Sequence, residues 1–131
     1  MENEVIEPRL YIIMREDLWD MNPGKGMAQA AHAQALFTID FEYQSTETYK
    51  VWKDQTTQGF GTTLVLHAPL EKFENICRAG GGNLVVDPTY PYRNFYGKVF
   101  TASVTTCGYV FVDKYTPKYV LDELKELPLH P

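Results

Sequence analysis

The chain has 131 residues, of which 44% are hydrophobic and 14% aromatic, and its formal net charge at pH 7 is −5. This length is typical of one domain with its own hydrophobic core, so residues 1–131 are expected to form a single domain. The acidic balance differs from the basic surplus that nucleic-acid-binding proteins normally carry. No apolar run is long enough to span a bilayer, and the acidic N-terminus lacks a signal segment. The two cysteines do not make a disulfide framework, so we expect a reduced protein of the cytoplasm.

The first half of the chain predicts one strand and two helices. After a lead at residues 1–9, a short apolar run bounded by charged residues predicts a buried strand at 10–15. An Asn-Pro-Gly sequence predicts a turn at 20–23. An alanine-rich helix is expected at 25–37, because alanine has the highest helix propensity. Aromatic and valine anchors predict a second helix at 41–55.

The middle of the chain alternates between strand and helix signals. β-Branched residues and leucines predict a strand at 62–68. Apolar residues at helical spacing predict a helix at 70–79, and three consecutive glycines after it predict its end. A strand is expected at 84–86, where an Asp-Pro pair ends it, and a loop rich in Tyr, Pro and Arg at 89–97.

The last part of the chain predicts further strand and one helix. Two strand-like stretches lie at 99–104 and 107–112, with Thr105 between them, and the final helix is expected at 117–127. Thr116 is its predicted N-cap, with a proline at the first helical position. The expected order is β-α-α-β-α-β-β-α. The predicted fold class is therefore α/β, a small mixed sheet of about four strands flanked by helices.

Three polar side chains share one stripe of the predicted first helix. Lys25, Gln29 and His32 follow the spacing i, i+4, i+7. A lysine in the first turn faces the positive end of the helix dipole, which costs about a few tenths of a kcal/mol. Beside exposed helix N–H groups, however, it makes a site for a phosphate or a developing oxyanion. The alternatives are a solvated surface lysine and a hydrogen-bonded structural histidine.

Two specific motifs surround this stripe: Arg15-x-Asp17-Leu18 and Gly24-Lys25-x-x-Ala28-Gln29-x-x-His32-Ala33. Weaker similarities continue at Trp52, Val85-Val86-Asp87, Thr106-Cys107 and residues 115–121. Together they resemble the archaeal and eukaryotic type of peptidyl-tRNA hydrolase, the Pth2 family. The resemblance implies hydrolysis of the ester between peptide and tRNA by water, without a metal or another cofactor. It also implies peptidyl-tRNA as the partner and a homodimer.

The same resemblance implies three catalytic residues. Lys25 matches a lysine held to be essential in the family, Asp87 would orient or deprotonate the water, and Thr106 would assist by hydrogen bonding. Asp87 and Thr106 each have a plain alternative: Asp87 as the aspartate of an Asx turn, and Thr106 as a strand former. The chain departs from the family pattern where Pro88-Thr89 replaces Ala-Gly, and the segment before Thr106 is longer.

Four further residues are candidates for substrate binding. Gln29 and His32 belong to the helical stripe. Arg93 and Lys98 are interleaved with tyrosines and phenylalanines, a mixture that suits a single-stranded RNA end. The alternative for this aromatic segment is packing onto its own domain or at a subunit interface. No H-E-x-x-H motif or paired-cysteine spacing indicates a metal site.

Two other functions stay open beside the hydrolase. One is a non-catalytic relative that keeps the fold and binds RNA or a protein, which the net charge of −5 and the altered aspartate turn favour. The other is a hydrolase of a different ester or amide, which has no need of a tRNA-binding surface.

Overall fold

The computed structural model describes residues 7–18, 21–40, 46–93 and 96–130. Its described strands form a mixed four-stranded sheet in the order β2-β1-β4-β3. The outer strand β2 is parallel to β1, whereas the β1–β4 and β4–β3 pairs are antiparallel. The strands are β1 (Arg9–Arg15), β2 (Thr63–Ala68), β3 (Asn83–Arg93) and β4 (Val99–Val112).

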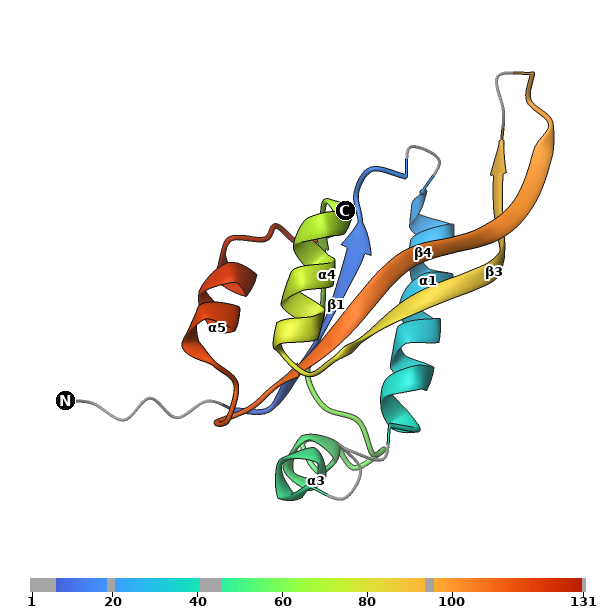
Figure 1. Ribbon diagram of the computed structural model, residues 1–131. Helices are drawn as coiled ribbons and strands as arrows, with labels where there is room; N and C mark the ends of the chain where they lie inside the picture. The colour runs from blue at the N-terminus through green and yellow to red at the C-terminus, as the bar shows by residue number, and fades with distance from the viewer. Residues whose placement is uncertain (1–6, 19–20, 41–45, 94–95, 131) are drawn as a thin grey trace.

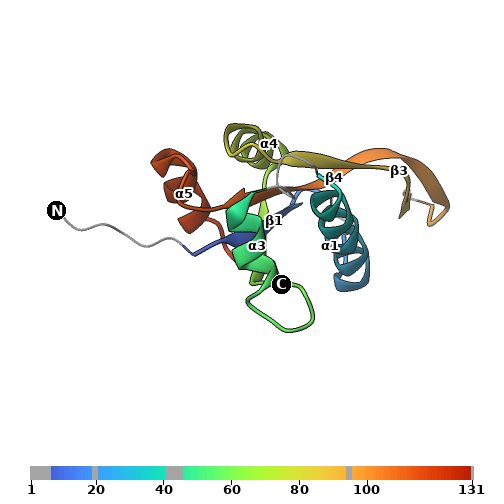
Figure 2. The ribbon, with the colours of Figure 1, turned by 90° about the horizontal axis from the view of Figure 1, so that it is seen from below.

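Helices cover both faces of this sheet. In Figure 2, α4 and α5 lie on one face and α1 and α3 on the other. The two central strands are therefore buried on both sides: in β4, Tyr109 packs in the α1 core and Val110 in the α4 core. The predicted fold class and element order are confirmed. The helices are α1 (Pro23–Thr38), α3 (Glu47–Lys53), α4 (Leu70–Ala79) and α5 (Lys118–Lys125).

Helix starts differ from the prediction because of their caps. Helix α1 begins at Pro23, since the side chain of Asn22 accepts a hydrogen bond from the Lys25 N–H. The predicted turn at 20–23 is thus the cap and start of a helix, apart from Asp20, which lies outside the described residues.

The second predicted helix is shorter than expected. Residues 41–45 lie outside the described residues, and α3 begins only after Thr46, whose extended backbone and side chain cap it. The prediction for the last helix was wrong in its cap. Helix α5 begins at Lys118 without a side-chain cap, because the Thr116 hydroxyl accepts from the Asp113 N–H instead. Helix α4 matches its predicted bounds, and Gly81 after it takes a positive φ of 76°.

The largest difference from the prediction is the hairpin of β3 and β4. Strand β3 does not end at Asp87 but continues to Arg93, so residues 89–93 of the predicted loop at 89–97 are strand, while residues 94–95 lie outside the described residues. The two stretches around Thr105 are one strand, β4. Strand β3 tolerates Pro88 and Pro91 because it is an edge strand, where a missing N–H need not break a ladder.

This hairpin reaches beyond the rest of the sheet (Figure 1). Strand β4 pairs with β1 only as far as Cys107, and toward the tip its partner among the described strands is β3. We call residues 88–93 and 96–103 the hairpin arm. The arm passes the N-terminal end of α1, and Asp87 at its base contacts Gln29 of that helix.

The C-terminal segment lies along the outer edge of β2. The His130 N–H donates to the Val65 carbonyl, and the His67 N–H donates to the Pro128 carbonyl. This pairing places the His130 ring against Gly26 in the first turn of α1, where a Cβ on Gly26 would come within 2.8 Å of Nε2. A larger residue at position 26 would therefore require the His130 ring to shift.

Candidate functional site

A chain of two short hydrogen bonds joins β4, α1 and β3. The Thr106 hydroxyl donates to Gln29 Oε1 at 2.7 Å, and Gln29 Nε2 donates to Asp87 Oδ2 at 2.7 Å. Thr106 and Gln29 are buried, with 0% and 3% of their surfaces exposed, whereas Asp87 is half-buried. The amide of Gln29 is thus held at both ends, and it presents the carboxylate at the rim of the helix–hairpin junction.

A β-bulge gives Thr106 its place in this chain. Val85 pairs with Cys107 and Val86 with Thr105, so Thr106 is the extra residue on β4. In a regular strand Thr106 and Cys107 would face opposite sides. Here both reach Gln29, since the Cys107 thiol lies 3.5 Å from the Gln29 carbonyl oxygen. Bulges commonly re-aim side chains in this way.

A second bulge orders the aspartate. Asp87 pairs with Val104 and Tyr90 with Ala102, which leaves one extra residue on β3 within the Pro88-Thr89 step. The Thr89 N–H donates to Asp87 Oδ1 at 2.9 Å, and its hydroxyl reaches the same oxygen at 3.3 Å. The departure from the family pattern is therefore an Asx turn that holds the carboxylate.

The surroundings of Asp87 favour its ionised form. Partial burial, the largest single influence, raises the pKa of the carboxyl. Hydrogen bonds from the Thr89 backbone, Gln29 and the Thr89 hydroxyl, together with the charge of His32, outweigh it, and the pKa of Asp87 falls below its usual value. Asp87 is thus an ionised acceptor at neutral pH.

Lys25 connects α1 to the hairpin arm. Its Nζ donates to the Pro91 carbonyl at 2.8 Å and lies 5.3 Å from the centre of the Tyr90 ring. The side chain is half-buried, one helical turn before Gln29. The ammonium group is therefore fixed on the same side of α1 as the hydrogen-bonded chain.

The other predicted residues divide into two groups. His32 is exposed on α1, one turn after Gln29, within electrostatic range of Asp87. Arg93 and Lys98 are exposed near the tip of the arm, away from the Thr106–Gln29–Asp87 chain. The structure therefore brings together the residues of α1, Asp87 and Thr106, and it separates Arg93 and Lys98 from them.

Three contributors were missed by the sequence analysis. Thr89 caps Asp87, and an Asp-x-Thr pattern is a signal that could have indicated it. Tyr90 is 1% exposed under Lys25, and Arg15 donates to the Thr105 carbonyl at 3.3 Å while pairing with Asp17. No local signal indicates Tyr90, because its burial depends on the bulge at Pro88-Thr89.

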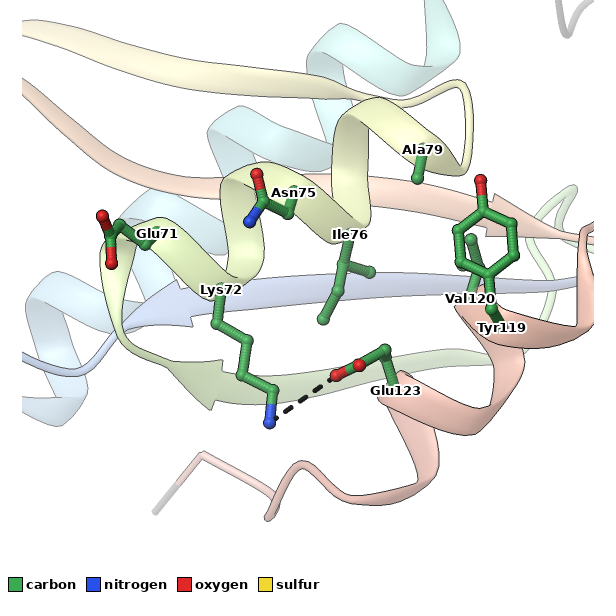
Figure 3. A pocket seen from close by; sticks show the side chains of 8 residues that line it. All are labelled: Glu71, Lys72, Asn75, Ile76, Ala79, Tyr119, Val120 and Glu123. Atoms are coloured by element: carbon green, nitrogen blue, oxygen red, sulfur yellow. Dashed lines mark ion pairs between the residues drawn. The ribbon is translucent and has the colours of Figure 1, made fainter.

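A cavity of about 510 Å³ near the start of α1 is lined by Arg15, Glu16, Asp17, Leu18, Met21, His67 and His130. Another, of about 500 Å³, opens between α4 and α5 on the opposite face of the sheet, where Lys72 and Glu123 form an ion pair of 3.7 Å (Figure 3). It contains none of the predicted site residues. Within the described ranges, no three His, Cys, Asp or Glu side chains converge as metal ligands, and no helix has the length and apolar character needed to cross a membrane.

Fold and site define a small α/β protein with an ordered carboxylate between its first long helix and an edge hairpin. A family model described as Peptidyl-tRNA hydrolase PTH2 matches residues 9–81, more than half of the chain. The protein therefore belongs to this family, and membership suggests hydrolysis of peptidyl-tRNA. No curated protein matches the chain. The matched region contains Lys25, Gln29 and His32 and ends before Asp87, Thr106 and the arm.

Proposed function

We propose that the protein hydrolyses the ester bond between peptide and tRNA in peptidyl-tRNA and so releases the tRNA for reuse. The observation that carries this proposal is the hydrogen-bonded chain from Thr106 through Gln29 to Asp87, which holds a carboxylate at the rim, next to the side of α1 that also carries Lys25. The fold and the family support it.

In this proposal Asp87 accepts a hydrogen bond from the attacking water. Each of its oxygens already accepts from the protein, and a carboxylate oxygen retains a further lone pair for water. Because its lowered pKa makes Asp87 a weak base, it orients the water more than it deprotonates it. The water oxygen bonds to the ester carbonyl carbon, and the bond from that carbon to the ribose oxygen breaks. The proton that the water releases is taken up by the leaving ribose oxygen.

Lys25 supplies positive charge to the same step. An ammonium group has three donors, one of which reaches the Pro91 carbonyl. The cation binds the terminal phosphate of the tRNA or the oxyanion that develops on the carbonyl oxygen. Its place in the first turn of α1 adds the partial positive charge of the helix N-terminus.

Gln29 and Thr106 take positioning roles. Both are buried, so Gln29 acts on Asp87 rather than on substrate, and Thr106 acts through Gln29. His32, Arg93 and Lys98 are exposed and bind the tRNA. The proposal carries three expectations with it: the protein acts in the cytoplasm, forms a homodimer and needs no cofactor.

The test is peptide release from purified N-acetyl-aminoacyl-tRNA in the presence of EDTA. We expect turnover by the wild type and a loss of at least about 100-fold in Lys25→Ala and Asp87→Asn. Asp122→Asn is the matched control, because Asp122 is a carboxylate on α5 that pairs with Lys118. Retention of full turnover in Asp87→Asn would overturn the assignment of the site. Absence of turnover by the wild type at every salt concentration would overturn the hydrolase.

A binding function is the second candidate. The hydrogen bond from Lys25 to the arm favours it, because the lysine already has a protein partner. In that case the protein binds tRNA in a salt-dependent manner without releasing the peptide. A filter-binding titration run beside the hydrolysis assay distinguishes the two functions.

A further inference from the structure

A row of aromatic rings follows one face of the hairpin arm. Tyr90 faces α1, where it lies against Lys25. Tyr92 is two residues further along β3 and therefore shares that face. Its cross-strand partner is Phe100, and the two rings lie 5.9 Å apart with an angle of 30° between their planes.

The rings of this row become more exposed to solvent with distance from α1. Tyr90 is 1% exposed, Tyr92 is half-buried and Phe100 is 37% exposed. Exposed aromatic faces in a row along a strand make a platform on which flat groups stack. The platform is continuous with the face that carries Asp87.

Positive charge is concentrated at the exposed end of the row. Arg93 and Lys98 are the only charged residues between Pro88 and Val112, in a chain whose net charge is −5. Lys98 Nζ lies 5.7 Å from the centre of the Phe100 ring, whereas Arg93 directly follows Tyr92 in β3, so its side chain leaves the opposite face of the strand. Cations next to aromatic faces are the combination that binds single-stranded nucleic acid, through phosphate contacts and base stacking.

We infer that the arm binds the unpaired 3′-terminal nucleotides of tRNA, with bases stacked on Tyr92 and Phe100 and a phosphate at Lys98. The inference rests on the proposed function and names the part of the substrate that this surface binds. Tyr92 lies five residues from Asp87 along β3, about 16 Å at the usual strand rise. A few nucleotides cover this length, so an RNA end on the arm places its terminal ester near Asp87.

The test measures binding without hydrolysis. Fluorescence anisotropy compares a 5′-labelled RNA hairpin that ends in unpaired ACCA with the same hairpin made blunt, neither carrying an ester. We expect the wild type to prefer the ACCA end. The double variant Tyr92→Ala/Phe100→Ala is expected to bind that end at least about tenfold more weakly and the blunt hairpin unchanged.

Two further variants are controls that distinguish loss of RNA binding from loss of folding. Phe100→Trp keeps a stacking surface and is expected to bind as the wild type does. Tyr119→Ala removes an exposed tyrosine from α5 and is expected to have no effect. Equal binding of the two RNA ends by the wild type, or unchanged ACCA binding by the double variant, would overturn the inference. Preference for ACCA without ester hydrolysis would overturn the proposed function alone.

Discussion

The side-chain amide of Gln29 donates a hydrogen bond to Asp87 at 2.7 Å, although the two residues lie 58 positions apart in the chain. The carbonyl oxygen of the same amide accepts from the Thr106 hydroxyl, so the rotamer and the orientation of the amide follow from its two partners. The Asp87 carboxylate is therefore held in place by hydrogen bonds through the neutral side chains of Gln29 and Thr106, and these bonds involve neither a metal ion nor a basic side chain.

Replacing Gln29 by leucine is expected to raise the pKa of Asp87. The variant removes one of the hydrogen bonds that hold this pKa down and leaves the burial that raises it. We expect a stability loss of about 1–3 kcal/mol and a fall in turnover of about tenfold. An NMR titration of the Asp87 carboxyl measures the pKa, and Gln34→Leu on the same helix is the control.

The pH dependence of that stability loss follows from the sign of the pKa shift. The folded pKa of Asp87 lies below its unfolded value, so its contribution is present above the unfolded pKa and is lost as pH falls through the folded pKa. The stability difference between wild type and Gln29→Leu should therefore narrow in acid. A difference that widens below pH 4 contradicts this explanation.

Replacing Thr106 by valine tests whether the hydroxyl acts through Gln29. Valine keeps the shape of the buried side chain but removes the donor to Gln29 Oε1, which costs about 1–2 kcal/mol of stability. We expect kcat to fall with little change in KM, and Thr106→Ser to restore it. A large rise in KM with unchanged kcat would indicate direct contact between Thr106 and the substrate instead.

His130 is expected to make the fold sensitive to mild acid. Both ring nitrogens are buried without a hydrogen-bond partner among the described residues. Burial, and then the charge of nearby His67, lowers the pKa of His130 below its ordinary value of 6.5. The unfolded chain therefore binds the proton more readily, and the free energy of unfolding should fall as pH drops through this range.

Urea denaturation at pH 7.5 and pH 5.5 measures this effect. His130→Phe keeps a ring against Gly26 without a titrating group and is expected to lose less stability between the two pH values than the wild type. His67→Gln is the companion variant, since His67 pairs with Glu16 at 2.8 Å and its ring centre lies 6.2 Å from that of His130. Equal pH dependence in wild type and His130→Phe would contradict the prediction.

Both cysteines are expected to be unreactive in the folded protein. Burial raises the pKa of Cys107 to about 12 despite a hydrogen bond with Thr106, and burial and then Cys107 raise the pKa of Cys77. Since the thiolate is the reactive form, a disulfide reagent at pH 8 should label neither thiol until the chain is unfolded. Rapid labelling of the native protein would contradict this, and Cys107→Ala should retain hydrolysis.

Local patterns in the sequence were enough for the order of the elements and for the helical stripe. The apolar spacing at 70–79 and the glycines after it predicted both ends of α4, because helical periodicity and helix termination depend on residues close together in the sequence. Lys25, Gln29 and His32 share one side of α1 for the same reason. The motif around them indicated the family that the comparison confirms.

Tertiary structure decided what those side chains contact. The two bulges turn Thr106 and Asp87 toward Gln29, and the edge position of β3 lets it run through Pro88 into an arm that the sequence predicted as a loop. Neither feature is encoded by neighbouring residues alone, because a bulge shifts register between two strands and an edge depends on which strands pair. The sequence therefore determined which residues could form a site, and the packing of hairpin against helix determined which of them meet.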